Sequence, residues 1–186
     1  MRRLIEIIFA LLIFITFSPL IIFISFKITL AADGPIIYWS KRIGKNNNIF
    51  LMPKFRTMHA NAPQVASHLL KDSSENITRF GIFLRKYSLD ELPQIYSIIN
   101  NDMSFVGPRP ALFNQYDLID LRTSKNIHKI KPGITGWAQI NGRDKISILK
   151  KVELDAFYLH QKNILLDIKI LYLTIFRVFL KKNITH

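Results

Sequence analysis

The chain carries the long apolar stretch IEIIFALLIFITFSPLIIFISF between Ile5 and Phe26. The stretch is almost wholly apolar and, as a helix, is long enough to span the ~30 Å hydrocarbon core of a bilayer. It is longer than the roughly 7–15 apolar residues of a signal peptide, and no A-x-A cleavage site follows closely. A helix that covers the core of a soluble protein has one polar face, and this stretch has none. The sequence therefore predicts a membrane-embedded helix.

Two features bear on whether this helix crosses the bilayer. Arg2 and Arg3 precede it and several basic residues follow it, so both flanks have the character of cytoplasmic segments. Inside it, Pro19 removes a helix hydrogen bond and kinks the axis, while the Ser18 hydroxyl can satisfy a freed backbone group. We expect a re-entrant helix over residues 1–30 that breaks at Ser18-Pro19. A kinked but spanning signal anchor is the alternative.

The rest of the chain, residues 31–186, is expected to form one small cytosolic domain packed on the membrane surface. The formal net charge is +13, and the basic residues are spread over most of the chain, which favours an anionic partner. Zinc-finger spacing, an RNP aromatic motif and a basic zipper region are absent from the sequence, so we expect no nucleic-acid partner. With no cysteine, a disulfide framework and a thiolate metal site are excluded.

Turn signals and periodicity predict an α+β domain that is mostly helical. A loop at Gly44–Asn48 separates two strands of a short β-hairpin, the second at Ile49–Lys54. Thr78–Lys86 and Leu92–Asn100 have apolar residues at helical spacing. Ile164–Lys182 is apolar with internal charges and is predicted to be an amphipathic helix in the membrane interface, with a buried helix as the alternative. The other expected elements are a helix and loop at 60–75, a loop at 105–110, helices at 111–122 and 146–161, and a Gly-rich loop at 131–142 with a strand near 137–140.

Two adjacent carboxylates, Asp90 and Glu91, are candidates for chemistry. Ser88 and Glu91 have the S-x-x-E spacing of a capping box, in which each side chain satisfies a backbone amide of the first helical turn. Pro93 permits a second register with Asp90 as the N-cap, because no intrahelical N–H is then needed at the proline. In that register Asp90 is freer for chemistry, and the sequence leaves both registers open.

Four motifs follow one another along the chain. They are KFRTM (Lys54–Met58), RKYSLDELPQ (Arg85–Gln94), DMSFVGPRP (Asp102–Pro110) and KPGITGWAQINGR (Lys131–Arg143). Together they resemble the bacterial sugar transferase family, the monotopic phosphoglycosyl transferases or polyprenyl-phosphate sugar-1-phosphate transferases. The resemblance covers essentially the whole chain. The length of the chain is similar to that of the minimal short form of this family.

The resemblance implies a membrane enzyme on the cytoplasmic face of the bacterial inner membrane. Such enzymes transfer a sugar 1-phosphate from a UDP-sugar to undecaprenyl phosphate, release UMP and initiate synthesis of a surface glycan (O-antigen or other lipopolysaccharide, capsule, exopolysaccharide or glycoprotein glycan). Both substrates are anions and one is bilayer-anchored, which suits the basic composition and the apolar helix. The donor expected for the minimal form is an N-acetylated or bacillosamine-like UDP-sugar, with a hexose as the alternative, and the oligomeric state is not predicted. A catalytically silent scaffold that recruits glycan-assembly enzymes is the second hypothesis, and a membrane-anchored nucleic-acid-binding protein is the third.

By the same resemblance, Asp90 is the nucleophile that forms an aspartyl-phosphosugar, and Glu91 binds Mg²⁺, with Mn²⁺ as the alternative ion. Arg109 is expected to clamp a phosphate, or else to tie its loop to a helix. The remaining basic and amide candidates for substrate or phosphate binding are less sharply assigned. They are Lys54 and Arg56, which line the site or face the headgroups, Arg85, which serves the phosphate or Asp90, and Asn141 and Arg143, which contact nucleotide or sugar.

The chain departs from the family pattern at Asn101, where the family usually has Gly. Asn tolerates a left-handed backbone better than most residues, so the turn is expected to survive. At the N-terminus, Glu6 stands where the family often has Asp. Asp155 and Asp167 lie in Lys-containing helices and are expected to form salt bridges.

Overall fold

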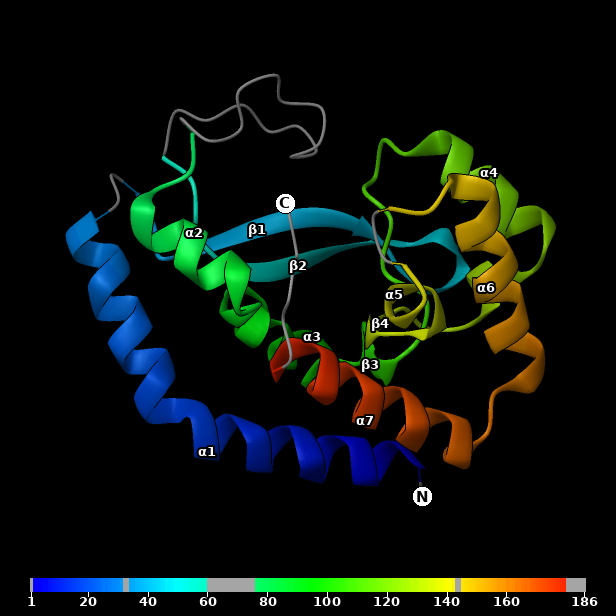
Figure 1. Cartoon of the computed structure of the whole chain (residues 1–186), viewed down its shortest axis with the longest axis horizontal. Coiled ribbons are helices and arrows are strands. Elements are labelled where there is room, and N and C mark those ends of the chain that lie inside the picture. The colour runs from blue at the N-terminus through cyan, green and yellow to red at the C-terminus, as the bar shows by residue number, and fades with distance from the viewer. Residues whose placement is uncertain (1, 32–33, 60–75, 143–144, 180–186) are drawn as a thin grey trace. The chain divides into compact units, whose positions relative to one another are not determined.

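The computed structural model describes residues 2–31, 34–59, 76–142 and 145–179 (Figure 1). The described elements are mostly helices, with two small two-stranded sheets, so the predicted α+β class with a short hairpin is confirmed. The chain divides into two compact units, which are described separately below. Unit 1 contains Met1–Ser40 and Met52–Tyr96, and unit 2 contains Lys41–Leu51 and Ser97–Lys181.

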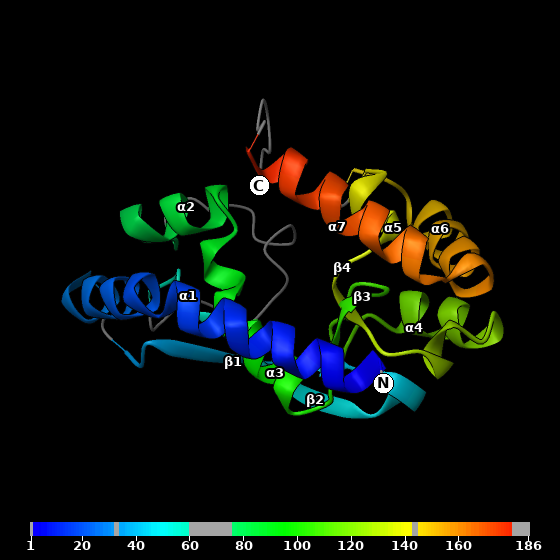
Figure 2. The ribbon, with the colours of Figure 1, turned by 90° about the horizontal axis from the view of Figure 1, so that it is seen from below.

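Unit 1 begins with helix α1, Arg2–Ala31, which is continuous but bent near its middle (Figures 1 and 2). Pro19 lies inside the helix, where it has no N–H for the preceding turn and its ring crowds the carbonyl four residues earlier. The adjacent Ser18 hydroxyl donates a hydrogen bond to the carbonyl of Ile15 at 2.8 Å. The predicted break is therefore a bend in an unbroken helix.

Helix α1 has two kinds of surface. Beyond the bend, Ile24 and Ile28 are buried in a core with Phe55 and Leu84, so this half belongs to the folded unit. Before the bend, large apolar side chains such as Ile15 are exposed. Among the described residues, this is the helix that is long and apolar enough to cross a bilayer. Such an apolar surface is stable in lipid and costly in water.

The β-hairpin is present as predicted. Strand β1, Ile37–Ile43, pairs with β2, Ile49–Phe55, through the short 3-10 helix η1, Lys45–Asn47. Asn46 and Asn47 have φ angles of 56° and 61°, a left-handed conformation that Asn adopts more readily than most residues. This run of asparagines therefore suits a tight reversal.

The predicted helix after the hairpin is α2, Arg79–Lys86. Thr78 is its N-cap, and its hydroxyl accepts a hydrogen bond from the amide of Gly81 at 2.9 Å. A Cβ at Gly81 would lie 2.1 Å from the carbonyl oxygen of Thr57, so glycine allows α2 to pack directly on the segment after β2. The helix and loop expected at 60–75 lie outside the described residues.

In unit 2, two of the motifs pack backbone against backbone. Strand β3, Ser104–Val106, is parallel to β4, Gly133–Thr135, with Ser104 opposite Gly133. A Cβ at Gly133 would lie 2.1 Å from the amide nitrogen of Gly107, and a Cβ at Gly136 would lie 2.1 Å from the carbonyl oxygen of Gly107. The glycines of GPRP and KPGITG are therefore needed for this close approach.

The strand expected near 137–140 is wrong. That segment is the short helix α5, Trp137–Ile140, and the strand lies just before it. The segment expected to be loop at 105–110 likewise begins in strand β3. A strand of three residues in a glycine-rich segment has no local periodicity, because it forms by pairing with a segment that is distant in sequence.

Four further elements complete unit 2 and confirm the predicted pattern of helices with shifted ends. Helices α4 and α5 both pack on α6, and α7 lies along α5 (Figure 2). On α7, Ile170 is fully buried, while Leu165 and Tyr172 are exposed, as expected for an amphipathic helix. Its place in the membrane interface stays a prediction. The bounds are α4 Tyr116–Ser124, the 3-10 helix η4 Ile127–Lys129, α6 Ile148–Gln161 and α7 Ile164–Phe179.

Candidate active site

The two adjacent carboxylates lie on a 3-10 helix, η3, Leu89–Gln94, which leads into α3, Ile95–Ile99. Ser88 precedes η3 with a left-handed φ of 55°, and its side chain makes no capping hydrogen bond. The capping box predicted as one alternative is therefore wrong. The Asp90 N-cap register is also wrong, since Asp90 lies inside η3. A left-handed non-glycine residue next to these carboxylates is the kind of backbone strain found at functional sites.

Asp90 and Glu91 point in different directions. In a 3-10 helix, neighbouring side chains diverge by about 120°. Asp90 is 9% exposed. Glu91 Oε1 accepts a hydrogen bond from Nζ of Lys54, on strand β2, at 3.3 Å. The pair thus offers two carboxylates with two separate surroundings.

Arg85 supplies positive charge near Asp90. It lies in the last turn of α2, and its Nε donates to Thr57 Oγ1 at 2.9 Å. Burial lowers the pKa of the Arg85 guanidinium, and the carboxylate of Asp90 opposes that shift. Of the two roles predicted for Arg85, the one beside Asp90 is supported by this attraction between the two charges, and contact with a substrate phosphate stays a prediction.

Lys54 and Arg56 serve different partners in unit 1. Lys54, on β2, pairs with Glu91. Arg56 follows the end of β2, and its Nε donates to the carbonyl of Pro35 at 2.7 Å, on the protein surface. Their contact with substrate stays a prediction.

Unit 2 contains the loop with Arg109. Arg122 on α4 donates from Nη1 to the backbone carbonyl of Arg109 at 2.8 Å. Its Nε and Nη2 donate to Asp155 Oδ2 on α6 at 3.0 Å and 2.6 Å. Arg42 Nη1 also donates to the carbonyl of Pro110 at 3.3 Å. The loop is therefore tied to the helices through Arg122, and both roles predicted for the side chain of Arg109, the phosphate clamp and the tie to a helix, stay predictions.

The Arg122–Asp155 pair is buried, and Asp155 is 1% exposed. Burial raises the pKa of the Asp155 carboxyl, and the positive charge of Arg122 and its hydrogen bonds oppose this shift. The salt bridge predicted for Asp155 is confirmed as a tertiary pair, whereas Asp167 accepts from the Tyr158 hydroxyl at 2.7 Å.

The structural role of Arg122 was not predicted from the sequence, although the sequence contains a signal for it. Leu118 and Arg122 are buried on one face of α4, and Val152 and Asp155 on one face of α6. One charge on the apolar face of each of two helices, with opposite signs, is the pattern of a buried pair.

The other predicted residues of unit 2 have structural contacts. Asn101 has a φ of 74°, so the predicted left-handed turn is confirmed, and its side chain accepts from Lys131. Asn141 Nδ2 donates to the carbonyl of Trp137 at 2.8 Å, and Trp137 stacks on Phe157. Arg143 lies outside the described residues. Contact of Asn141 or Arg143 with substrate stays a prediction.

A divalent cation is compatible with Glu91. Among the described residues, no group of three or more His, Asp or Glu side chains is gathered to hold a metal. Mg²⁺ needs few protein ligands, because it is commonly held by one or two carboxylates together with substrate phosphates and water. The Glu91 carboxylate next to Asp90 fits that donor set, because carboxylate oxygens suit hard ions such as Mg²⁺ better than soft metal ions.

The family model of the bacterial sugar transferases matches residues 1–181. The chain belongs to the bacterial sugar transferase family. The predicted resemblance and the predicted class of enzyme, a phosphoglycosyl transferase, are therefore confirmed.

Curated relatives of this sugar transferase fall into two groups by length. The chain is 39% identical to the uncharacterized sugar transferase EpsL of Bacillus subtilis, over 99% of this chain and 90% of that protein. It is 33% identical to the exopolysaccharide production protein ExoY of Sinorhizobium fredii, over 98% and 87%. It is 38% identical to the UDP-glucose:undecaprenyl-phosphate glucose-1-phosphate transferase of Escherichia coli, over 98% of this chain but 41% of that protein. The chain thus spans less than half of this longer relative.

Proposed function

We propose that this sugar transferase moves a sugar 1-phosphate from a UDP-sugar to undecaprenyl phosphate and releases UMP, as the first step of a surface glycan. The observation that carries the proposal is the Asp90–Glu91 pair, with Arg85 near Asp90 and Lys54 on Glu91. Several relatives, such as the E. coli protein, are named for undecaprenyl-phosphate sugar transfer. A basic protein with an apolar helix suits two anionic substrates, one of them a lipid.

The proposed reaction has two displacements at one phosphorus. A carboxylate oxygen of Asp90 attacks the sugar-bearing phosphorus, the bond from this phosphorus to the oxygen of UMP breaks, and UMP leaves with that electron pair. A phosphate oxygen of undecaprenyl phosphate then attacks the same phosphorus and displaces the Asp90 carboxylate. Carboxylates are established covalent phosphoryl acceptors, and two easier steps replace one hard step.

The remaining side chains have supporting roles in this proposal. Arg85 is proposed to stabilise the negative charge of the substrate phosphate beside Asp90. Arg109 is proposed as a ligand of phosphate oxygens, because the planar guanidinium can donate two hydrogen bonds to them. Glu91 is proposed to hold Mg²⁺, which when bound offsets charge on the diphosphate and on the departing UMP. Lys54 keeps the Glu91 carboxylate oriented.

Turnover assays in membranes test the proposal. With a suitable UDP-sugar and undecaprenyl phosphate, UMP should be released continuously; without the lipid acceptor, release should stop after at most about one UMP per protein, as in ping-pong kinetics. EDTA should abolish turnover, and Mg²⁺ should restore it. A screen across UDP-sugars would identify the donor.

Two results would contradict the proposal. Full turnover in EDTA would remove Glu91 from its metal role. Absence of UMP release with every UDP-sugar tested, from folded protein in membranes, would favour the catalytically silent scaffold.

We also propose that α1 is re-entrant and that the catalytic domain lies on the cytoplasmic face. The support is the bend of α1 at its proline, the basic residues at both flanks, and the packing of its second half into unit 1. A helix whose far half is part of the domain core is well suited to return to the face from which it entered.

Cysteine labelling in intact cells tests this topology. The chain has no cysteine, so single Arg2→Cys and Lys41→Cys variants each provide one thiol. Both thiols should resist a membrane-impermeant reagent and react with a permeant one. Labelling of the Arg2→Cys site alone by the impermeant reagent would establish a spanning helix.

A further inference from the structure

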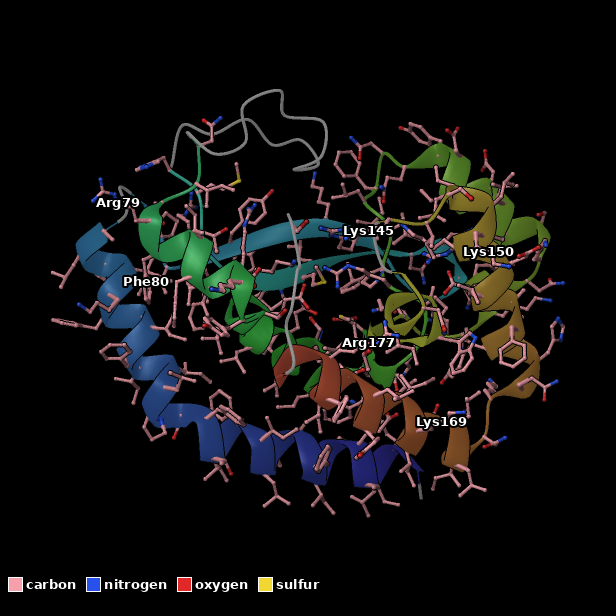
Figure 3. All side chains as sticks on the ribbon, viewed as in Figure 1. Arg79, Phe80, Lys145, Lys150, Lys169 and Arg177 are labelled. Carbon is pink, nitrogen blue, oxygen red and sulfur yellow. The ribbon has the colours of Figure 1, made fainter. Side chains whose placement is uncertain are left out.

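A cation-lined pocket in unit 1 has no part in the chemistry proposed above. It has a volume of about 480 Å³ and lies where the carboxyl end of α1 meets the amino end of α2. Figure 3 shows Arg79 and Phe80 in the first turn of α2, beside this end of α1. Its walls include the cationic or titratable residues Lys27, His59 and Arg79, the apolar Leu30 and Phe80, and the N-cap Thr78.

The charge of the pocket is positive. In the part of the chain that the structure describes, the side chains of Lys27, His59 and Arg79 form no ion pair, and no carboxylate lines the pocket. The two cations Lys27 and Arg79 at one cavity repel each other unless an anion joins them. The pocket therefore suits a phosphate group.

The position of the pocket along α1 indicates where such a phosphate would come from. No charged residue occurs in α1 between Glu6 and Lys27, so Lys27 is the first charge after the apolar stretch. If that stretch lies in hydrocarbon, Lys27 lies at the depth of the lipid headgroups. Exposed Leu30 and the ring of Phe80 give the pocket an apolar side for the first carbons of a lipid chain.

We propose that this pocket binds the phosphate group of a membrane lipid, with Lys27 and Arg79 as its main ligands. The proposal rests on the proposed function in placing α1 in the membrane. The shared chemistry is a lipid-linked phosphate, and its two sources are an anionic phospholipid of the bilayer and the polyprenyl phosphate acceptor.

Native mass spectrometry of the full chain in nanodiscs tests the proposal. Nanodiscs of phosphatidylcholine are prepared alone, with phosphatidylglycerol, or with undecaprenyl phosphate, and the lipid retained on the protein is counted. Lys27→Gln/Arg79→Gln should bind the added anionic lipid roughly 30-fold more weakly than the natural chain, because each cation near an anionic lipid contributes about fivefold. The matched control is Lys125→Gln/Lys150→Gln, which removes the same charge from α4–α6 surfaces and should retain the lipid; Figure 3 shows Lys150 on α6.

The outcomes separate the two sources and the two proposals. Retention of both anionic lipids assigns the pocket to bilayer phosphate, and retention of undecaprenyl phosphate alone assigns it to the acceptor. Equal retention by the pocket variant and the control variant, with both folded by circular dichroism, would overturn the inference. So would competition by inorganic phosphate as effective as that by the lipid. UMP release by the natural chain is measured separately, so the transferase proposal stands or fails independently.

Discussion

Asp90→Asn should reduce turnover to the background of the assay while the protein stays folded. Asparagine has nearly the size of aspartate, and Asp90 caps no helix in the structure, so little stability should be lost. The amide cannot act as an anionic nucleophile, and loss of a covalent nucleophile reduces kcat by about 10⁴-fold or more. The measurement is UMP release in membranes, with thermal unfolding of the purified variant as the control for folding.

Glu91→Gln is the matched comparison, because it changes the neighbouring carboxylate in the same way. It should slow turnover and raise the Mg²⁺ concentration needed for half-maximal rate, with partial recovery at high Mg²⁺. Asp90→Asn should show no such recovery. Near-normal turnover by Asp90→Asn would remove Asp90 from the nucleophile's role.

Asp155→Ala should have the largest effect on stability among the changes considered. It leaves the Arg122 guanidinium buried without its carboxylate, and breaking a buried pair in this way typically costs about 3–5 kcal/mol. For a chain of this size, the midpoint of thermal unfolding in detergent should fall by roughly 10 °C. The Arg109 loop should also loosen, because Arg122 donates to its backbone.

Two controls separate a buried pair from charge in general. Arg122→Met/Asp155→Leu replaces both partners by apolar groups of similar volume, so it should recover most of the lost stability. Lys150→Ala breaks an exposed pair with Glu153 on the same helix and should leave the midpoint unchanged. If Asp155→Ala unfolds at the same temperature as Lys150→Ala, the buried pair does not stabilise unit 2.

Local signals in the sequence predicted the elements whose cause is local. The apolar run and its proline predicted a bent membrane helix, and the asparagine-rich loop predicted the hairpin reversal. Left-handed Asn101 followed from the conformational range of asparagine. In each case the residues that determine the conformation are neighbours in the sequence.

Long-range packing explains what the sequence did not predict. Strand β4 forms because Gly133 lets its backbone meet Gly107, 26 residues earlier in the sequence, and no local periodicity indicates that contact. The S-x-x-E spacing predicted a capping box, but the Ser88 amide donates to the carbonyl of Arg85, and Glu91 pairs with Lys54 of the hairpin. The buried pair of Arg122 was not predicted because its partner, Asp155, lies on another helix.

If Asp90 carries the sugar phosphate covalently, the adduct can be trapped when the lipid acceptor is withheld. Protein incubated with its UDP-sugar and Mg²⁺ but without undecaprenyl phosphate is quenched, digested and examined by mass spectrometry. We expect a gain of one sugar-phosphate mass on the peptide that contains Asp90, absent from Asp90→Asn and lost when undecaprenyl phosphate is added before the quench. An adduct on another peptide, or steady turnover by Asp90→Asn without any adduct, would contradict it.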